Sequence, residues 1–192
     1  LEKVLEKMQK DLEEQKDKDV VAIFEQEQEE RAIISYRELL EKKEELMAMT
    51  DDERFMKEAL QEARVALAKD EVPIGAVIVA DGCIIGRGHN LTETLHDVTA
   101  HAEMQAITAA EEYLGGKYLD KCTLYVTVEP CVMCAGAMGW SQVQRVVYGA
   151  SDPKRGFQTY APRALHPKTS IIDGVLAEEC GKLITDFFKS KR

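Results

Sequence analysis

The 192-residue chain has few cysteines and no long apolar run, and both scarcities exclude classes of protein. Its five cysteines form an odd set, whereas small secreted domains with a disulfide framework usually carry an even and denser set. The longest apolar stretches span only a few residues, so we expect no membrane-spanning segment. The first residues are charged and lack the apolar stretch of a secretory signal peptide. A cytoplasmic location is therefore the expectation.

Basic residues are in the minority, with 25 Lys and Arg against 35 Asp and Glu, which gives a net charge of −10. This balance argues against indiscriminate binding of polyanions. Residues 145–168 depart from it, because they contain one acidic residue, Asp152, against the basic residues Arg145, Lys154, Arg155, Arg163 and Lys168. This basic stretch is either a solvated loop region or a local surface for an anionic partner.

Residues 1–48 contain no Gly, Pro, Cys or His and are rich in charge. Apolar residues recur at helical spacing over 1–12 and again over 37–47, while 20–24 fits either a short strand or part of a helix. The segment is a partner-binding element, a coiled-coil strand, foreign sequence joined to the domain, or, as we favour, a helical extension without chemistry. We expect the working domain to be 49–192, since Met49 precedes Thr-Asp-Asp-Glu, a sequence that can cap a helix.

From residue 50 onward, helical and strand patterns alternate. Asp81-Gly82 predicts a hairpin turn, and Gly115-Gly116 is expected to end a helix. Helices that alternate with strands after one opening hairpin indicate an α/β fold with a mixed sheet covered on both faces. The patterns predict helices over 52–69, 100–114, from Pro130 and over 176–189, and strands over 74–80, 83–87, 122–128, 143–148 and 170–175.

Two short motifs, Thr99-Ala-His101-Ala-Glu103 and Glu129-Pro130-Cys131-Val-Met-Cys134, lie where helices are predicted to begin. The two cysteines, three residues apart, project from the same side of a first helical turn. The free N–H groups and the dipole of that turn favour thiolates. Two thiolates and the imidazole of His101 make three Zn²⁺ ligands and leave a fourth position for water, which is typical of a catalytic zinc site. Zinc lowers the pKa of such a water to about 7.

Two rival interpretations of the cysteine pair are weaker. A closed structural site would need Cys122, which begins the strand leading to Pro130 and is expected roughly 25 Å from Cys131. Cys83 and Cys180 have no ligand-like spacing and are expected to be small buried apolar residues. A redox pair would explain C-x-x-C alone, but the preceding proline and the His-x-Glu motif favour zinc.

Glu103 is the candidate catalytic residue. Two positions after a metal-binding histidine, it can take a proton from the zinc-bound water and deliver it to the substrate and to the leaving group. Residues two apart diverge by about 200° on a regular helix, so the orientation of Glu103 must come from the fold.

The pairing of H-x-E with P-C-x-x-C is the signature of zinc nucleobase deaminases. Over residues 50–192 the sequence resembles the bacterial tRNA-specific adenosine deaminase family, on the strings Glu71-Val-Pro-Ile-Gly-Ala-Val77, Gly88-His-Asn90, Asp97–Glu103, Thr123–Met138 and Tyr148-Gly-Ala-Ser-Asp152. The resemblance implies a three-layer α/β/α fold of cytidine deaminase type with a mixed five-stranded sheet, and a homodimer. It also implies hydrolytic deamination of adenosine to inosine at the wobble position of a tRNA anticodon.

The resemblance further implies substrate contacts. Asn90 would hydrogen-bond the flipped nucleotide, Ile74 and Val128 would line the base pocket, and Asp152 would lie near the ribose and backbone. Phe187 and Phe188 match a terminal helix that touches the anticodon loop in the family. Without the resemblance, Asn90 is an ordinary turn residue, Ile74 and Val128 are core, and the phenylalanines are one helix face. Valine stands at 98 where the family often has proline, and we expect packing to hold the backbone there.

Two rival functions stay open. A deaminase of a free nucleobase or nucleoside, of guanine or cytosine type, would have the same zinc site, with the basic stretch and the paired phenylalanines incidental. A binding module with structural zinc, to which residues 1–48 recruit an unknown partner, would not need Glu103.

Overall fold

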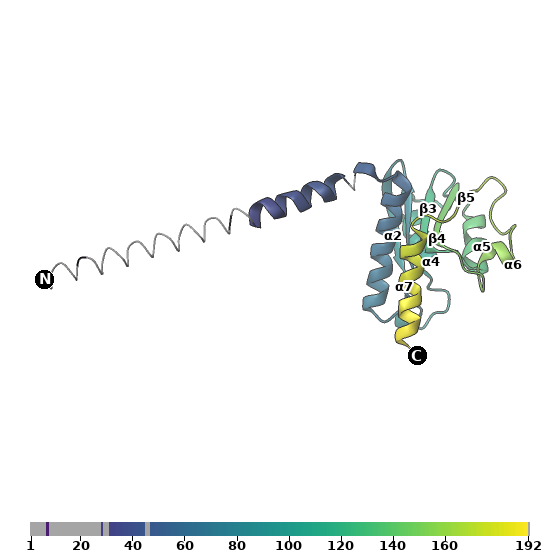
Figure 1. Ribbon diagram of the computed structural model, residues 1–192. Helices are drawn as coiled ribbons and strands as arrows, with labels where there is room; N and C mark the ends of the chain where they lie inside the picture. Colours follow the sequence, from purple (N-terminus) through teal and green to yellow (C-terminus); the bar gives the residue numbers. More distant parts are fainter. Residues whose placement is uncertain (1–6, 8–27, 29–30, 45–46, 192) are drawn as a thin grey trace. The chain divides into compact units, whose positions relative to one another are not determined.

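The computed structural model describes residues 31–44 and 47–191, together with Lys7 and Gln28 (Figure 1). The chain separates into two compact units, Leu1–Met49 and Thr50–Arg192. Residues 31–44 are helical, so this helix begins earlier than the pattern over 37–47 predicts. The patterns over 1–12 and 20–24, and the apolar residue Leu46, lie outside the described residues, apart from Lys7.

The second unit opens with helix α2 (Asp51–Ala68), whose start matches the predicted cap. The Thr50 hydroxyl accepts a hydrogen bond from the Glu53 amide at 3.2 Å, and the Glu53 carboxylate accepts one from the Thr50 amide at 2.8 Å. This reciprocal capping box satisfies two backbone donors that the helix itself leaves unpaired. The inner side of α2 is fully buried through Met56, Ala59, Leu60 and Ala63.

Five strands form one mixed sheet, as predicted, and their order in the sheet is β2-β1-β3-β4-β5. The first three pair antiparallel and the last three pair parallel. Asp81 and Gly82 both have positive φ, of 48° and 75°, as the two-residue hairpin between β1 and β2 requires. The strands are β1 (Gly75–Ala80), β2 (Cys83–His89), β3 (Thr123–Val128), β4 (Arg145–Ala150) and β5 (Ser170–Ile172).

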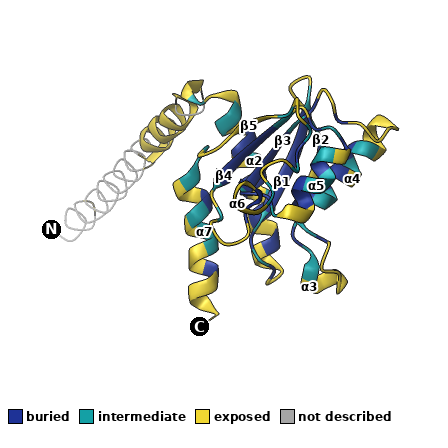
Figure 2. Ribbon diagram, turned by 90° about the vertical axis from the view of Figure 1, so that its right-hand side faces the viewer, coloured by how far each residue is buried: buried dark blue, intermediate teal, exposed yellow. Residues whose placement is uncertain are grey.

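Alternating residues of the strands feed two separate cores, one on each face of the sheet. Val77, Val79, Tyr125 and Val147 pack against α2 and α7 (Ala177–Ser190). On the other face, Ile78, Leu124, Val126, Val146 and Tyr148 pack against α4 (Ala102–Leu114) and α5 (Val132–Trp140). Figure 2 shows the buried strands between these helices, so the predicted three-layer α/β/α architecture is confirmed.

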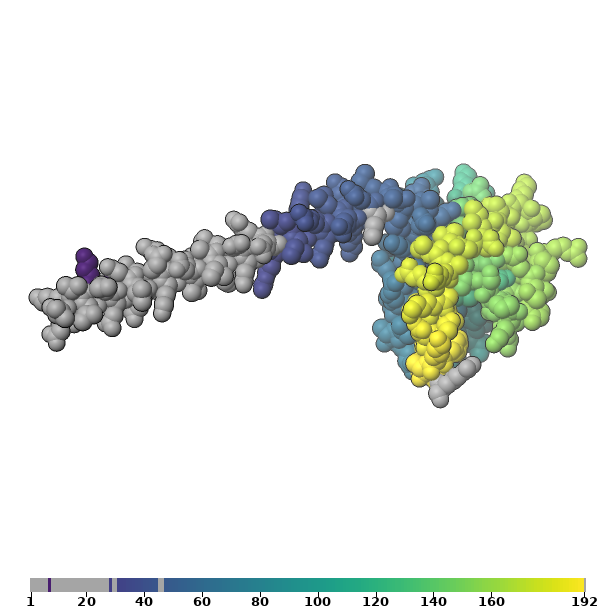
Figure 3. All heavy atoms as spheres, in the orientation of Figure 1, coloured from purple at the N-terminus to yellow at the C-terminus, as the bar shows by residue number. Residues whose placement is uncertain are grey.

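Helices α2 and α7 lie side by side on their face of the sheet (Figure 3). Arg64 of α2 pairs with Glu179 of α7 at 2.8 Å, and Lys191 after α7 pairs with Asp70 after α2 at 2.5 Å. Two single-turn helices, α3 (Thr92–Leu95) and α6 (Phe157–Tyr160), lie in the connecting loops. None of the helices within the described ranges is both long and apolar enough to cross a membrane.

The start of α4 is held close to β2 by a glycine. A Cβ added at Gly88 would lie 2.2 Å from the Ala102 carbonyl oxygen and 2.6 Å from the Ala106 amide nitrogen. Only a residue without a side chain allows this approach, which fixes where α4 begins relative to the sheet.

Several expected boundaries shift. The helix expected from residue 100 begins at Ala102, because His101 has extended backbone and acts as its N-cap. The helix expected to open at Pro130 begins at Val132, with Cys131 as the N-cap. The last strand stops at Ile172, before Gly174 turns the chain with φ of 77°. Cys180 is buried as predicted, but the expectation for Cys83 is wrong: it follows the hairpin turn on the edge strand and is exposed.

Candidate active site

His101, Cys131 and Cys134 meet where α4 and α5 begin on the same side of the sheet. The His101 Nδ1 atom lies 3.6 Å from the Cys131 sulfur and 3.5 Å from the Cys134 sulfur, and the two sulfurs are 3.7 Å apart. Within the described ranges, these three side chains form the one His, Cys, Asp and Glu group that has ligand atoms close enough together to hold a metal ion. Cys122 is buried and is not part of the group.

The three separations fit a tetrahedral ion of the size of Zn²⁺. Zinc bound tetrahedrally, at about 2.3 Å to sulfur and about 2.0–2.1 Å to nitrogen, would separate two sulfurs by about 3.8 Å and sulfur from nitrogen by about 3.5 Å. The observed edges of 3.5, 3.6 and 3.7 Å match this triangle. A tetrahedral ion held by these three atoms keeps one corner for an exogenous ligand.

The backbone at both helix starts explains how the ligands converge. His101 and Cys131 are N-caps with extended backbone, at φ −71°, ψ 156° and φ −74°, ψ 171°. Because His101 precedes α4, the divergence of about 200° expected between His101 and Glu103 on a regular helix does not apply. Glu103 is the second residue of α4 and is buried near His101, Cys131 and Cys134.

The two thiols have different affinities for a proton. Hydrogen bonding to Cys134, together with neighbouring His101, lowers the pKa of the Cys131 thiol to about 4. Hydrogen bonding to the Cys131 sulfur and burial raise the pKa of Cys134. The negative charge on Cys131 and the lack of solvent thus disfavour ionisation of the Cys134 thiol. A divalent cation between them removes this opposition, because it compensates both charges at once.

Glu103 is a buried carboxyl, and His101 is the basic side chain near it. Burial raises its pKa above the ordinary value for glutamate. A carboxyl whose pKa is raised holds a proton more readily and can still release it, which is the property that general acid–base catalysis needs.

The segment before α4 is held by hydrogen bonds, and the expectation that packing holds Val98 is wrong. Val98 is 83% exposed. The Asp97 carboxylate instead accepts hydrogen bonds from the Thr99 amide at 2.8 Å and from the Thr99 hydroxyl at 2.7 Å. This turn delivers His101 to the metal group without proline, because the aspartate side chain fixes the backbone on either side of Val98.

Asn90 is buried and oriented by Glu71, a residue that the motif analysis did not select. The Asn90 amide nitrogen donates to a Glu71 carboxylate oxygen at 3.1 Å and to the Thr92 hydroxyl at 3.0 Å. Both N–H donors are therefore committed, which leaves the amide oxygen to accept a bond from elsewhere. Glu71 is fully buried, and the Thr94 amide donates to its other oxygen at 2.7 Å.

Of the remaining candidate residues, Ile74, Val128 and Asp152 lie in or next to the strands, whereas Phe187 and Phe188 lie on the C-terminal helix. Ile74 is half-buried and packs against the same core as Cys131, while Val128 ends β3 opposite Ala150. The Asp152 carboxylate accepts hydrogen bonds from the Lys154 and Arg155 amides, at 2.9 and 3.1 Å, and so shapes the turn after β4.

Phe187 and Phe188 lie on α7, which covers the other face of the sheet from α4 and α5. Their exposures differ: Phe187 is 7% exposed and Phe188 is 49% exposed. The two rings pack edge to face with centroids 5.3 Å apart. The structure does not bring this pair to the metal group, and only Phe188 has the exposure that a contact with a partner requires.

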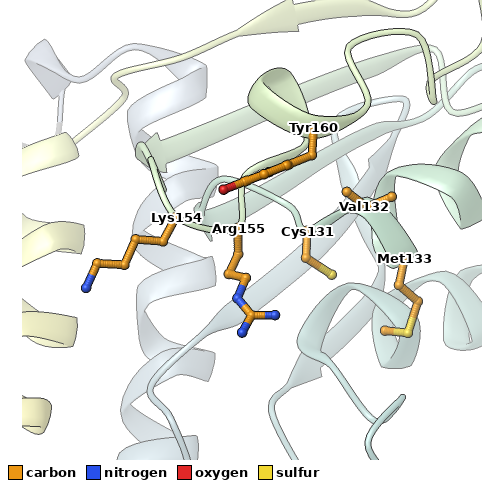
Figure 4. A pocket seen from close by; sticks show the side chains of 6 residues that line it. All are labelled: Cys131, Val132, Met133, Lys154, Arg155 and Tyr160. Atoms are coloured by element: carbon orange, nitrogen blue, oxygen red, sulfur yellow. The ribbon is translucent and has the colours of Figure 1, made fainter.

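The basic residues of the stretch 145–168 have different surroundings in the structure. Arg145 is half-buried and forms a two-pronged pair with Asp52, at 2.8 and 2.5 Å, so it is not free to bind an anion. Lys154 and Arg155 are exposed and line a pocket of about 530 Å³ beside Cys131. In Figure 4 the Arg155 and Cys131 side chains extend in the same direction, below the ring of Tyr160.

Residues 49–150 match the model of the cytidine and deoxycytidylate deaminase zinc-binding region. A tRNA-specific adenosine deaminase of Bacillus subtilis is 48% identical over 149 residues, which are 75% of this chain and 92% of the relative. The chain belongs to the tRNA-specific adenosine deaminase family of zinc-binding deaminases.

Solved structures agree with this membership. One comes from a study of A-to-I editing by tRNA:A34 deaminases at the wobble position of transfer RNA. It is 44% identical, has a TM-score of 0.64, and covers 68% of this chain and 98% of its own. A guanine deaminase from Nitrosomonas europaea is 25% identical with a TM-score of 0.61, covering 70% of this chain and 83% of its own. The deaminase fold that the resemblance implies is therefore confirmed, and it is shared by enzymes that act on different substrates.

Proposed function

We propose that this deaminase converts adenosine to inosine in tRNA, at the wobble position of the anticodon. The observation that carries the proposal is the Zn²⁺-sized triangle of His101, Cys131 and Cys134 with Glu103 buried beside it. The relatives named for tRNA-specific adenosine deamination, which the chain matches over nearly their whole length, support the choice of substrate.

Zn²⁺ held by His101, Cys131 and Cys134 would supply a water of lowered pKa as the nucleophile for C6 of adenine. Glu103 takes a proton from that water and places it on ring nitrogen N1, which lets C6 accept the new C–O bond. Glu103 then moves a second proton from the added oxygen to the exocyclic amine. The C–N bond breaks, ammonia leaves and the inosine carbonyl forms, so one water is consumed for each ammonia released.

The positions of the side chains support a set of proposed substrate contacts. The target base must leave its stack to reach the ligand group, which costs least for an unpaired loop base. We propose that Asn90 presents its amide oxygen to the nucleotide, that Ile74 and Val128 flank the base, and that Asp152 shapes the turn beside the ribose. Lys154 and Arg155 would meet backbone phosphates and Phe188 the anticodon loop, and Phe187 would support Phe188 from beneath.

The decisive experiment compares RNA with free bases. Zinc-loaded protein is incubated with an anticodon stem-loop that carries adenosine at the wobble position, and separately with guanine, cytosine, adenosine and cytidine. Mass spectrometry of digested RNA should show inosine, with no turnover of the free compounds. Turnover of a free base beside inert RNA would replace the proposal with the free-base alternative, which the shared fold of the guanine deaminase keeps in the test.

We also propose that residues 49–192 contain all of the catalytic chemistry, in a homodimer, and that 1–48 form a helical appendage. Deleting 1–48 should leave kcat on the stem-loop within about twofold, while sizing by light scattering reports the number of copies before and after. Loss of activity on deletion would show that the appendage takes part in catalysis or assembly.

A further inference from the structure

Glu129 is another buried carboxylate close to the site, and the proposed chemistry does not use it. It is 8% exposed and lies two residues before Cys131. One of its oxygens accepts a hydrogen bond from the Asp152 amide at 2.9 Å, and the other accepts one from the Gln158 amide at 3.1 Å. The carboxylate therefore bridges the two ends of the 152–158 turn.

Gly156 is shaped to this carboxylate. A Cβ added at Gly156 would lie 2.3 to 2.4 Å from the carboxyl carbon and both carboxylate oxygens of Glu129. The backbone of Gly156 has φ of −61°, which any residue can adopt. A side chain at 156 would therefore have to displace the Glu129 carboxylate, although the conformation of the chain there does not itself need glycine.

The same turn is bonded directly to the ligand segment. Gly156 forms an isolated antiparallel bridge with Cys131, and the Phe157 amide donates to the Pro130 carbonyl at 2.9 Å. Glu129 is therefore placed to set the register between the turn and Cys131. Lys154 and Arg155 lie within the turn and line the pocket that Cys131 also lines (Figure 4).

We propose that Glu129 is a positioning residue, which fixes the 152–158 turn against the Cys131 segment so that Lys154 and Arg155 face the phosphate backbone of the RNA. This inference rests on the proposed function, because it needs an RNA substrate. A carboxylate suits the task since it offers two acceptors to two N–H donors, whereas glutamine offers one acceptor and would point an N–H₂ group at the other donor.

The test measures how RNA binding depends on salt, because each lost phosphate contact on a single strand lowers the slope of log K against log salt by about 0.7. Full-length, zinc-loaded protein binds a stem-loop with purine at the target position, which has no 6-amino group to lose. We expect Glu129→Ala to lower the slope by about 1.4, as the double variant Lys154→Ala/Arg155→Ala does. Glu129→Gln should lower it by about half as much.

Lys57→Ala provides the matched control, because Lys57 is an exposed lysine of α2 on the other face of the sheet. It should leave the slope unchanged. A merely structural role for Glu129 would lower the melting temperature or the zinc content and leave the slope at the wild-type value, and that result overturns the inference. A wild-type protein that binds no RNA overturns the proposed function itself, so the two failures are distinct.

A double-mutant cycle gives a second measurement that does not depend on salt. Gly156→Ala alone should raise KM for the stem-loop about tenfold with a smaller change in kcat, because the new methyl group displaces the Glu129 carboxylate. In the Glu129→Ala background the same change should add less than twofold, since the space that the methyl group needs is already vacant. Equal effects of Gly156→Ala in both backgrounds would contradict the contact on which the inference depends.

Discussion

The two faces of the sheet treat their buried polar groups in opposite ways. On the α2 and α7 face, the Tyr125 hydroxyl donates to Asp52 at 2.9 Å, and Arg145 completes the charge balance. On the α4 and α5 face, Glu103, Cys131 and Cys134 bring several acidic groups together, with His101 as the neighbouring base.

The difference distinguishes polar groups that stabilise the fold from polar groups that can take part in a reaction. A buried network with matched charges stabilises one conformation and changes its protonation reluctantly. A buried group of acids with too little positive charge lowers the stability of the fold unless a cation compensates it. A metal site keeps this deficit of positive charge, and the bound metal ion fills it. We therefore expect different effects of substitutions on the two faces. The largest effects should come from the α4 and α5 face, where the acidic groups lack a matching positive charge.

Removing the metal should have the largest effect. Chelation of the purified protein, or Cys134→Ser, should abolish deamination to the detection limit and lower the melting temperature, because the buried acids are left uncompensated. An activity assay and calorimetry measure these two quantities, and metal analysis checks that Zn²⁺ is gone. Added Zn²⁺ should restore the chelated protein but not the variant. A chelated protein with full activity would remove the metal from the mechanism.

Glu103→Gln should have the next largest effect on rate. The amide keeps the volume of the side chain but cannot carry a proton, so kcat should fall by about 10³-fold, inside the usual range for general acid–base catalysis. The zinc content should stay at one per chain, since Glu103 is not one of the three ligands. Activity within tenfold of wild type would show that another group moves the protons.

Substitutions of Phe187 and Phe188 examine the α2 and α7 face. Phe187→Ala should lower the free energy of unfolding by about 3 kcal/mol, because it removes a buried ring, whereas Phe188→Ala should cost less than about 1 kcal/mol. Urea denaturation measures both. The proposed anticodon contact predicts the reverse order for RNA affinity measured on folded protein, and equal effects of the two variants in both assays would remove the distinction.

Asp52→Asn should have a smaller effect that depends on pH. Hydrogen bonding to Arg145 lowers the pKa of Asp52 below its ordinary value of 3.8. The stabilisation from this carboxylate is therefore fully present above the unfolded-state pKa and is lost as pH falls through the folded-state pKa.

At pH 7 the free energy of unfolding of wild type should accordingly exceed that of Asp52→Asn by about 1–3 kcal/mol. This difference should vanish below about pH 4. Denaturant titrations of both proteins between pH 3 and pH 7 provide the measurement. A gap of constant size across that range would show that the charge of Asp52 is not its source.

Regular patterns in the sequence predicted most of the fold. The Asp81-Gly82 turn, the cap at Thr50 and the alternation of helices with strands are local signals, because turn and cap chemistry act over three or four residues. Positions that depend on contacts distant in sequence were missed or wrong. Cys83 is exposed at an edge that only strand order defines. Glu129 is the first residue of the second metal motif, but it meets its hydrogen-bond partners 23 and 29 residues later.

The sequence by itself determined the candidate ligand set, since His101, Cys131 and Cys134 have residue types and spacings that suit Zn²⁺, and the structure brings the same three side chains together. Only the tertiary structure decided how the ligands converge. Helix N-caps leave the helical conformation, and they alone let His101 and Glu103 face one centre from positions two apart. Tertiary contacts also decided that Arg145 pairs with Asp52, whereas Lys154 and Arg155 line the pocket, because pairing depends on which charges the fold brings within about 4 Å.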